Sequence, residues 1–346
     1  MMDHVDGTDV AVRRLRAIDV VGVVLFIFAI AWTLLAGSQG EPIRGAEVLA
    51  ASGVVLLMAR VAAGFIRIVP PTLVLIATAA IAVAAHGELL SSRPLSRPFG
   101  YANAKGAFFM IAAIAGLMVA TGTSNLALRL VGVAAAAGAA VVPFASHVVA
   151  SSLLLVVIPV AAMLAVLAGR DGARPAVIVC GALCVLALAG TALLGARSTS
   201  APASGIELRI RRALTTDRLV LWHEAEHMMA QHPLRGVGPA RFDEVSTLAR
   251  QDPSNRLFWA HNDFLQEGAE LGIPGFVLLV GLFVWGFIAL WANPTGDVFV
   301  ALAASAVAAV GIQACVDYVL HFPAVALAVA ALVGAGIAPS REGRTT

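Results

Sequence analysis

The sequence predicts an all-α polytopic membrane protein with about ten transmembrane helices and one large helical loop on the far side of the membrane. Hydrophobic residues make up 60% of the 346 positions and charged residues only 13%, whereas a soluble domain is roughly half apolar and a quarter charged. Apolar runs long enough to cross a bilayer recur along almost the whole chain. One polar stretch, from about Ala196 to Leu271, interrupts them and has the composition of a loop outside the bilayer.

The predicted spans divide the chain into three parts. Residues 1–195 form an N-terminal set of about seven transmembrane helices, residues 196–271 form the loop, and residues 272–346 add about three helices and a cytoplasmic tail. The individual spans are expected at residues 18–37, 46–66, 70–90, 104–121, 126–145, 147–168, 175–195, 273–292, 298–319 and 322–338.

Two of these boundaries depend on short interruptions within nearly continuous apolar sequence. Pro143 and the polar pair Ser146-His147 separate the fifth span from the sixth. The stretch His321-Phe322-Pro323 separates the last two spans. A proline disfavours helical backbone in the residue before it, so each interruption predicts a turn between two helices.

The distribution of arginines predicts the orientation, because basic residues favour the cytoplasmic ends of spans. Basic residues before the first span place the N-terminus in the cytoplasm, and ten spans return the C-terminus to the same side. The arginines at predicted cytoplasmic ends are Arg13, Arg14, Arg16, Arg67, Arg129, Arg170, Arg174, Arg341 and Arg344. The arginines left in the outer loop are Arg197, Arg209, Arg211, Arg212, Arg218, Arg235, Arg241, Arg250 and Arg256. Long loops cross regardless of charge, and this cationic surface indicates an anionic ligand. The net charge of only +2 gives no reason to expect a nucleic-acid partner.

The loop is expected to contain two amphipathic helices. The first runs from about Thr216 to Gln231, and its apolar stripe consists of Leu221, Trp222, Ala225, Met228 and Met229. The second begins near Asn262 or Asp263, either of which is a good N-cap. A turn at Gly272-Ile-Pro-Gly275 then leads into the eighth span.

One motif in the first loop helix suggests a metal site. His223-Glu224-Ala225-Glu226-His227 has the H-E-x-x-H spacing, which places two histidines on one helical face with a glutamate as base. However, its fourth position is charged and no further zinc-protease motif follows it. The alternative is a solvated polar flank of a helix whose apolar stripe packs inward.

Two other constellations suggest chemistry without a metal. His261 precedes a predicted helix N-terminus, where the helix dipole favours the neutral imidazole that a general base requires. Its alternative role is to cap the helix. An outer turn places Arg97, Asn103 and Lys105 near the fourth span, and arginine forks match phosphate oxygens. The alternative for these cations is snorkelling at the membrane interface.

Taken together, these stretches resemble the O-antigen ligase and polymerase superfamily of bacterial membrane glycosyltransferases. The stretches that carry the resemblance are Phe99-Gly-Tyr-Ala-Asn-Ala-Lys-Gly-Ala, Arg218-Leu-Val-Leu-Trp222, His232-Pro-Leu-Arg-Gly-Val-Gly-Pro239, His261-Asn-Asp-Phe-Leu-Gln266, Glu270-Leu-Gly-Ile-Pro-Gly275 and Asp317-Tyr-Val-Leu-His-Phe-Pro323. They cover roughly residues 90–338. The resemblance implies a multi-pass protein of the bacterial inner membrane whose loop is periplasmic.

The resemblance also implies an activity. Members transfer an oligosaccharide from an undecaprenyl-diphosphate carrier to a hydroxyl acceptor, which is lipid A-core or a growing glycan, and they use no metal or other cofactor. His261 matches the histidine that activates the acceptor hydroxyl, and Arg218 matches a loop arginine that holds the diphosphate. A second family arginine follows a serine near the start of a span. Here that place is Ser146-His147, so the arginine is absent.

The missing arginine leaves the second diphosphate ligand open among His147, Arg97 and Lys105. Supporting roles are expected for Asn103, Glu270 and Asp317. An acid near the outer end of a span is a functional candidate, although Asp317 is equally suited to pair with a loop arginine.

Two other classes remain as alternatives to glycan transfer. A transporter of a small anion is expected to carry charges at the bilayer midplane or paired broken helices, but here the polar residues gather at the outer surface. A membrane zinc protease would use the H-E-x-x-H motif.

Overall fold

A computed structural model describes residues 7–37, 40–93, 95–168, 172–197, 216–251 and 258–339, and every regular element within them is a helix. The protein is therefore all-α, as the sequence predicts. Some of the arginines that were used to predict the orientation and the outer loop lie outside the described residues. They are Arg170, Arg209, Arg211, Arg212, Arg256, Arg341 and Arg344. The orientation and the three-part division consequently remain predictions.

Long apolar helices account for most of the chain. The helices within the transmembrane parts are α1 (Gly7–Ala36), α2 (Pro42–Phe65), α3 (Val69–Ala84), α4 (Ala102–Thr121), α5 (Leu126–Ala145), α6 (Val149–Ala168), α7 (Arg174–Arg197), α12 (Asp263–Trp291), α13 (Val298–Ala314) and α14 (Pro323–Ile337). Seven of them are long and apolar enough to span a membrane. The shorter helices α3, α13 and α14 fall on the other three expected spans. The chain is a multi-pass membrane protein, and ten remains the predicted number of spans.

The two interruptions predicted between spans are confirmed. Helix α5 ends at Ala145 and α6 begins at Val149, while α14 begins at Pro323. Two helices end earlier than expected, because α3 ends at Ala84 instead of residue 90 and α13 ends at Ala314 instead of residue 319. Asp317 therefore lies in the turn after α13, close to the short 3-10 helix η2 (Val319–His321).

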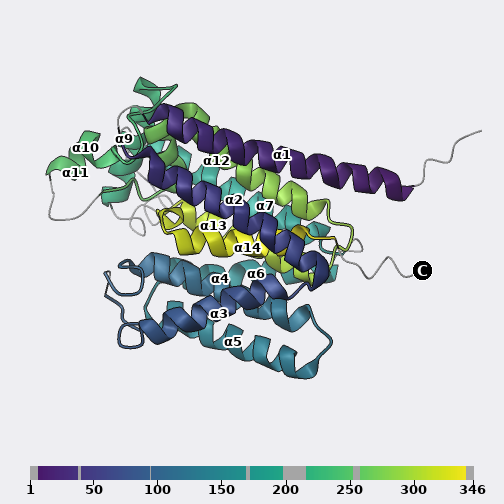
Figure 1. Ribbon diagram of the computed structural model, residues 1–346. Helices are drawn as coiled ribbons and strands as arrows, with labels where there is room; N and C mark the ends of the chain where they lie inside the picture. Colours follow the sequence, from purple (N-terminus) through teal and green to yellow (C-terminus); the bar gives the residue numbers. More distant parts are fainter. Residues whose placement is uncertain are drawn as a thin grey trace, which may run out of the picture.

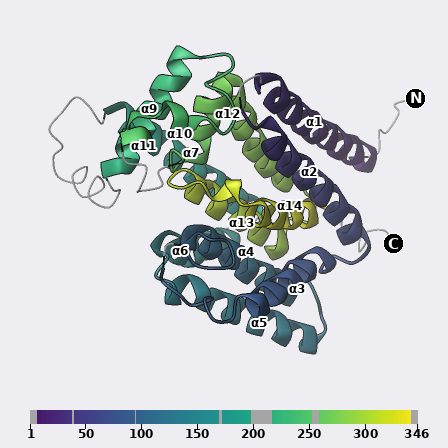
Figure 2. The same ribbon diagram turned by 60° about the vertical axis from the view of Figure 1, so that its left-hand side comes forward.

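Helices α4 and α13 form the centre of the bundle. Helix α4 is buried along nearly its whole length and contacts α3, α5, α6, α13 and α14. Figure 2 shows α3, α4 and α5 on one side of α13 and α14, with α1, α2 and α12 on the other. Small residues permit this close packing. A Cβ atom placed on Gly116 of α4 would lie only 2.7 Å from the carbonyl oxygen of Gly132 on α5.

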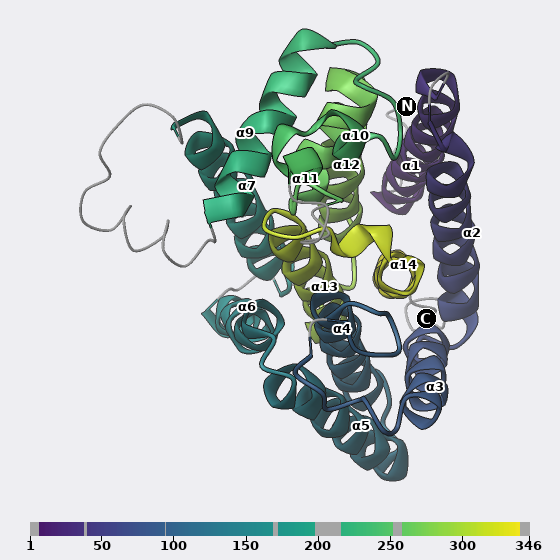
Figure 3. The same ribbon diagram turned by 90° about the vertical axis from the view of Figure 1, so that its left-hand side faces the viewer.

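The loop helices gather at one end of the bundle (Figures 1 and 3). Helix α9 (Thr216–Gln231) has the predicted bounds, and Leu221, Trp222 and Ala225 of its apolar stripe are fully buried. It packs on α7 and α12. Two short helices that the sequence analysis missed, α10 (Phe242–Val245) and α11 (Thr247–Gln251), lie beside it.

Helix α12 joins the second loop helix to the eighth span. Asn262 is its N-cap, and its side-chain oxygen accepts a hydrogen bond from Leu265 N at 3.0 Å. The predicted turn is a kink at Gly272, with φ of 73° and ψ of −172°, that joins two helical segments within α12. A side chain is excluded there, because a Cβ atom would lie 2.6 Å from the Pro233 carbonyl oxygen. The kink fixes the helix N-terminus at the loop end of the bundle.

Candidate active site

Two segments distant in the sequence bind each other at the loop end of the bundle. Asn262 Nδ2 donates to the Cys315 carbonyl at 2.7 Å, and Asp263 N donates to the Asp317 carbonyl at 3.1 Å. In the opposite direction, Leu320 N donates to Asp263 Oδ2 at 3.0 Å. This pairing ends α13 before Asp317, because the backbone there bonds to the start of α12 instead of continuing the helix. It also fixes His261 against the turn that carries Asp317.

The buried carboxylate of Asp317 is the centre of the site. Its side chain is only 3% exposed. Tyr101 donates a hydrogen bond from its hydroxyl to Oδ1 at 2.6 Å, Asn103 donates from Nδ2 to Oδ2, and Tyr318 N donates to Oδ1 at 2.9 Å. Three donors therefore satisfy a charge that would be costly to bury alone.

The same carboxylate brings His261 and Arg218 together. His261 Nδ1 lies 3.4 Å from Asp317 Oδ1, and Arg218 Nη2 lies 3.7 Å from Asp317 Oδ2. The His261 backbone has a φ of 53°, a left-handed conformation that histidine adopts more readily than most residues. Trp222 of α9 donates from its indole nitrogen to the His261 carbonyl at 3.2 Å. The loop helix thus holds the backbone of His261 in place.

The electrostatics of this cluster keep Asp317 ionised. Burial acts to raise the pKa of Asp317, but the contacts with His261 and Arg218 outweigh burial and lower it below the ordinary value of 3.8. Burial and the nearby carboxylate raise the pKa of Tyr101, so its phenol remains a donor. The result at neutral pH is a negative charge that faces one imidazole and one guanidinium.

Aromatic rings support the site, and the sequence analysis missed their role. Tyr318 stacks on Tyr101 with ring centroids 4.5 Å apart and on Trp259 at 4.6 Å. The His261 ring meets Tyr318 edge-on at 4.8 Å. The chain contains only two tyrosines and both lie here. The sequence offered one signal for this role. Tyrosine is rare in the chain, and each of the two tyrosines lies in a stretch that carries the family resemblance.

The other predicted site residues have separate positions. Lys105 is fully buried, and its ammonium donates to the Ser91 carbonyl at 2.8 Å, to Ser96 Oγ at 2.9 Å and to the Glu88 carbonyl at 3.3 Å. It therefore fixes the turn before α4 and leaves no donor for a ligand. Glu270 accepts from Ala240 N at 2.8 Å, as well as from Phe242 N and Gln266, so it ties the loop to α12.

His147 and Arg97 are exposed. Within the described part of the chain, neither the His147 ring nor the Arg97 guanidinium has a hydrogen-bond or ion-pair partner. The structure thus brings together His261, Arg218, Asn103 and Asp317, and it leaves His147 and Arg97 as free cations or donors at the surface.

The H-E-x-x-H motif has a structural explanation. The Glu224 carboxylate accepts hydrogen bonds from the Ser246 hydroxyl, from Thr247 N at 3.1 Å and from Leu248 N at 3.2 Å. It therefore caps α11. Across the described residues, no group of three or more His, Cys, Asp or Glu side chains is arranged to hold a metal ion.

Comparison with known families agrees with this geometry. The family profile described as O-antigen ligase matches residues 107–280, which is half of the chain. The chain belongs to the O-antigen ligase family. No curated protein matches it. As an O-antigen ligase family member, it is a glycosyltransferase-like membrane enzyme that acts on glycans of lipopolysaccharide or polysaccharide biosynthesis.

The match covers only part of the site. It includes Arg218 and His261, begins after Asn103 and ends before Asp317. The turns before α4 and after α13 lie outside the family match. Their contribution to the site of this O-antigen ligase family member is therefore known from the structure alone.

Proposed function

We propose that this O-antigen ligase family member transfers an oligosaccharide from undecaprenyl diphosphate to a hydroxyl acceptor at the periplasmic face of the bacterial inner membrane. The acceptor class is lipid A-core or a growing glycan. The observation that carries the proposal is the position of one ionised carboxylate, Asp317, between the His261 imidazole and the Arg218 guanidinium. The proposal also places both termini in the cytoplasm and the loop of residues 196–271 in the periplasm.

His261 acts as the general base in this scheme. Asp317 faces Nδ1, so Nε2 is left to receive the proton of the acceptor hydroxyl. The acceptor oxygen attacks the anomeric carbon while the bond between that carbon and the phosphate oxygen breaks. The imidazole becomes a cation in this step, and the neighbouring carboxylate stabilises it.

Arg218 stabilises the leaving group. Its guanidinium has a single polar partner among the described residues, Asp317 at 3.7 Å, so most of its five N–H donors are available. A departing undecaprenyl diphosphate carries the electron pair of the broken bond as negative charge on its terminal phosphate. Arginine binds such oxygens in a bidentate manner. Without a metal in the scheme, preorganised donors provide this stabilisation.

The second diphosphate ligand is proposed to be His147 or Arg97, because both are exposed and unpaired within the described chain. Lys105 is set aside because its three hydrogen bonds occupy its ammonium. His147 follows Ser146 at the position where the family pattern has an arginine. An imidazole that can be protonated would therefore replace a permanently charged guanidinium at this position.

The test is transfer of a glycan by the purified protein in lipid nanodiscs from an undecaprenyl-diphosphate donor. Asparagine tolerates the positive φ of residue 261, so His261→Asn removes the base with little backbone strain. We expect a loss of 100-fold or more, on the order of what general bases contribute. His227→Asn, in an exposed histidine of α9, is the matched control and should keep full activity. Equal activity in the two variants would contradict the proposal.

A further inference from the structure

The paired segments also carry a second polar cluster. His321 donates from Nδ1 to Asp263 Oδ1 at 2.9 Å, so Asp263 fixes the orientation of this imidazole. Burial acts to lower the pKa of His321, but the Asp263 carboxylate outweighs it and holds the pKa above its ordinary value. Among the described residues, His321 Nε2 has no hydrogen-bond partner. This pair lines a cavity whose lining does not include Arg218.

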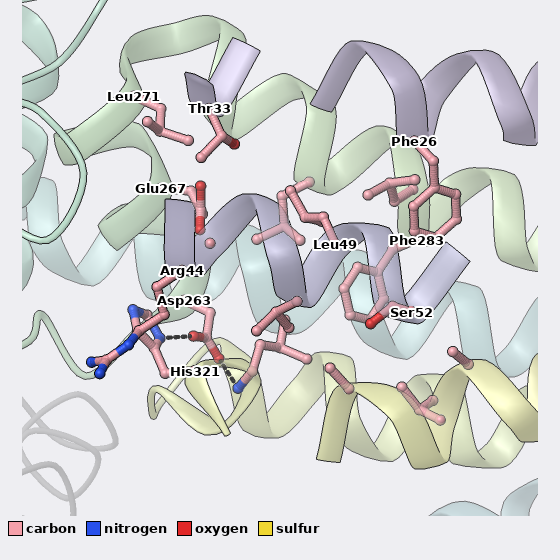
Figure 4. Close-up of a pocket in the computed structure, with 18 of the residues that line it drawn as sticks. Phe26, Thr33, Arg44, Leu49, Ser52, Asp263, Glu267, Leu271, Phe283 and His321 are labelled. Atoms are coloured by element: carbon pink, nitrogen blue, oxygen red, sulfur yellow. Dashed lines mark hydrogen bonds and ion pairs between the residues drawn. The ribbon is translucent and has the colours of Figure 1, made fainter. Parts of the chain in front are cut away.

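The cavity lies between α1, α2, α12 and α14 and has a volume of about 330 Å³ (Figure 4), which is typical of ligand pockets. Its long wall is apolar and includes Phe26, Leu49, Leu56 and Phe283. From Arg44 at the polar end to Leu56, the wall follows α2 for about 18 Å, at roughly 1.5 Å per residue. A cavity of this shape suits a hydrocarbon chain that lies along the helices.

The polar end of the cavity is acidic. The carboxylates that line it are Glu41, Asp263, Glu267 and Glu270, and the cationic side chains are Arg44 and His321. Figure 4 shows Glu267 on α12 between Thr33 and Arg44. Carboxyl groups outnumber the cationic side chains at this end and His321 already pairs with Asp263, so the lining favours a hydroxylated headgroup over a lipid diphosphate. The donor's diphosphate is instead placed on the Arg218 side.

Glu267 identifies the headgroup that fits. Its half-buried carboxylate has no hydrogen-bond or ion-pair partner among the described residues. The oxygens of a carboxyl group accept hydrogen bonds, and a partly desolvated carboxyl group without a partner is costly. Sugar hydroxyls provide several closely spaced donors. The half-buried ring of Trp259 also lines this end and stacks on Tyr318 of the active site, so a headgroup bound here lies next to the site.

We propose that this cavity binds a glycolipid, with its hydrocarbon chain along α2 and α14 and its sugar hydroxyls on Glu267. Resting on the proposed function, the glycolipid is the acceptor, and the cavity presents its headgroup beside His261. The two lipids would then occupy opposite sides of the paired segments, with the diphosphate on the arginine side and the hydroxylated headgroup on the glutamate side.

The test uses binding, so it does not depend on turnover. The full-length protein in phosphatidylcholine nanodiscs is photolabelled with dodecyl glucoside that carries a diazirine at the chain end, and the labelled peptides are mapped by mass spectrometry. We expect labels on α2 and α14 near Ser52 and Val329, both of which line the cavity. Unlabelled dodecyl glucoside should compete, whereas dodecyl phosphate of the same chain length should compete at least tenfold less well.

Two variants complete the test. Glu267→Gln keeps the side-chain shape and should weaken competition by dodecyl glucoside about tenfold, which corresponds to about 1.4 kcal/mol. Ser52→Trp fills the cavity and should abolish labelling, whereas Ser152→Trp on α6, outside the cavity, should not. Labels on other helices would overturn the proposal. So would stronger competition by dodecyl phosphate than by dodecyl glucoside, combined with a Glu267→Gln variant in which competition by dodecyl glucoside is unchanged. Absence of glycan transfer by a wild-type protein that labels as expected would instead count against the proposed function.

Discussion

Replacing Asp317 by asparagine removes the charge that faces both His261 and Arg218 while keeping the size of the side chain. In the proposed reaction the imidazole is neutral before proton transfer and cationic in the transition state. The carboxylate therefore stabilises the transition state more than the ground state, and its loss is expected to appear in kcat.

The magnitude follows from the distance of 3.4 Å between His261 Nδ1 and Asp317 Oδ1. Unit charges at this separation interact by roughly 5 kcal/mol at an effective dielectric constant of about 20. The His261 side chain is 15% exposed, and the asparagine oxygen still contacts the ring. We therefore expect about half of this energy to be lost, which is about 2.5 kcal/mol and lowers kcat roughly 70-fold.

The assay is single-turnover glycan transfer in nanodiscs, with size-exclusion chromatography to show that the variant is folded. The matched control is Asp297→Asn, which removes a carboxylate that pairs with Arg67 at 2.7 Å outside the site. The control should keep the wild-type kcat. Because the pKa of Asp317 lies below 3.8, its charge persists above about pH 4 and is lost only as the pH falls further. A folded Asp317→Asn variant with wild-type kcat would refute the reasoning.

Four further predictions concern other groups. Arg218→Lys should raise the KM for the lipid donor about tenfold and leave acceptor KM unchanged, because an ammonium cannot form the bidentate contact; an unchanged donor KM would remove this role. Burial raises the pKa of Glu226 to about 7, so the stability of the wild-type protein falls as the pH rises from about 4.5 to 7. In thermal unfolding, Glu226→Gln should therefore stabilise the protein by up to about 2 kcal/mol at pH 8 and not at pH 4. Glu224→Gln, which weakens the cap of α11, should lower Tm at both pH values. Transfer should continue after treatment with EDTA, and a loss that zinc restores would favour a metal site at the H-E-x-x-H motif.

Local patterns in the sequence predicted the elements well. Periodicity, capping and proline chemistry predicted the bounds of α9, a cap at Asn262 or Asp263, and the breaks at Ser146-His147 and Pro323. These signals act over a few residues, so one sequence contains them. The short helices α10 and α11 were missed because the carboxylates at their N-termini come from other helices, Glu270 of α12 for α10 and Glu224 of α9 for α11.

The partners within the candidate site could not be predicted in the same way. Tyr101 and Asp317 are 216 residues apart, and only packing of the complete bundle brings them together. Lys105 illustrates the same difficulty in reverse. Beside Arg97 it suggested an anion ligand, yet three acceptors of its own turn bind its ammonium. Side-chain type indicates what a group can do, whereas tertiary contacts decide what it does.

The hydrogen bonds between residues 259–263 and residues 315–321 run in both directions. Either segment grafted alone into a related enzyme would lose the partners that shape it, because each supplies donors to the other's acceptors. Engineers who wish to change the acceptor or the donor should therefore exchange the two segments together. The same coupling predicts that substitutions in one segment are accompanied over evolution by compensating substitutions in the other.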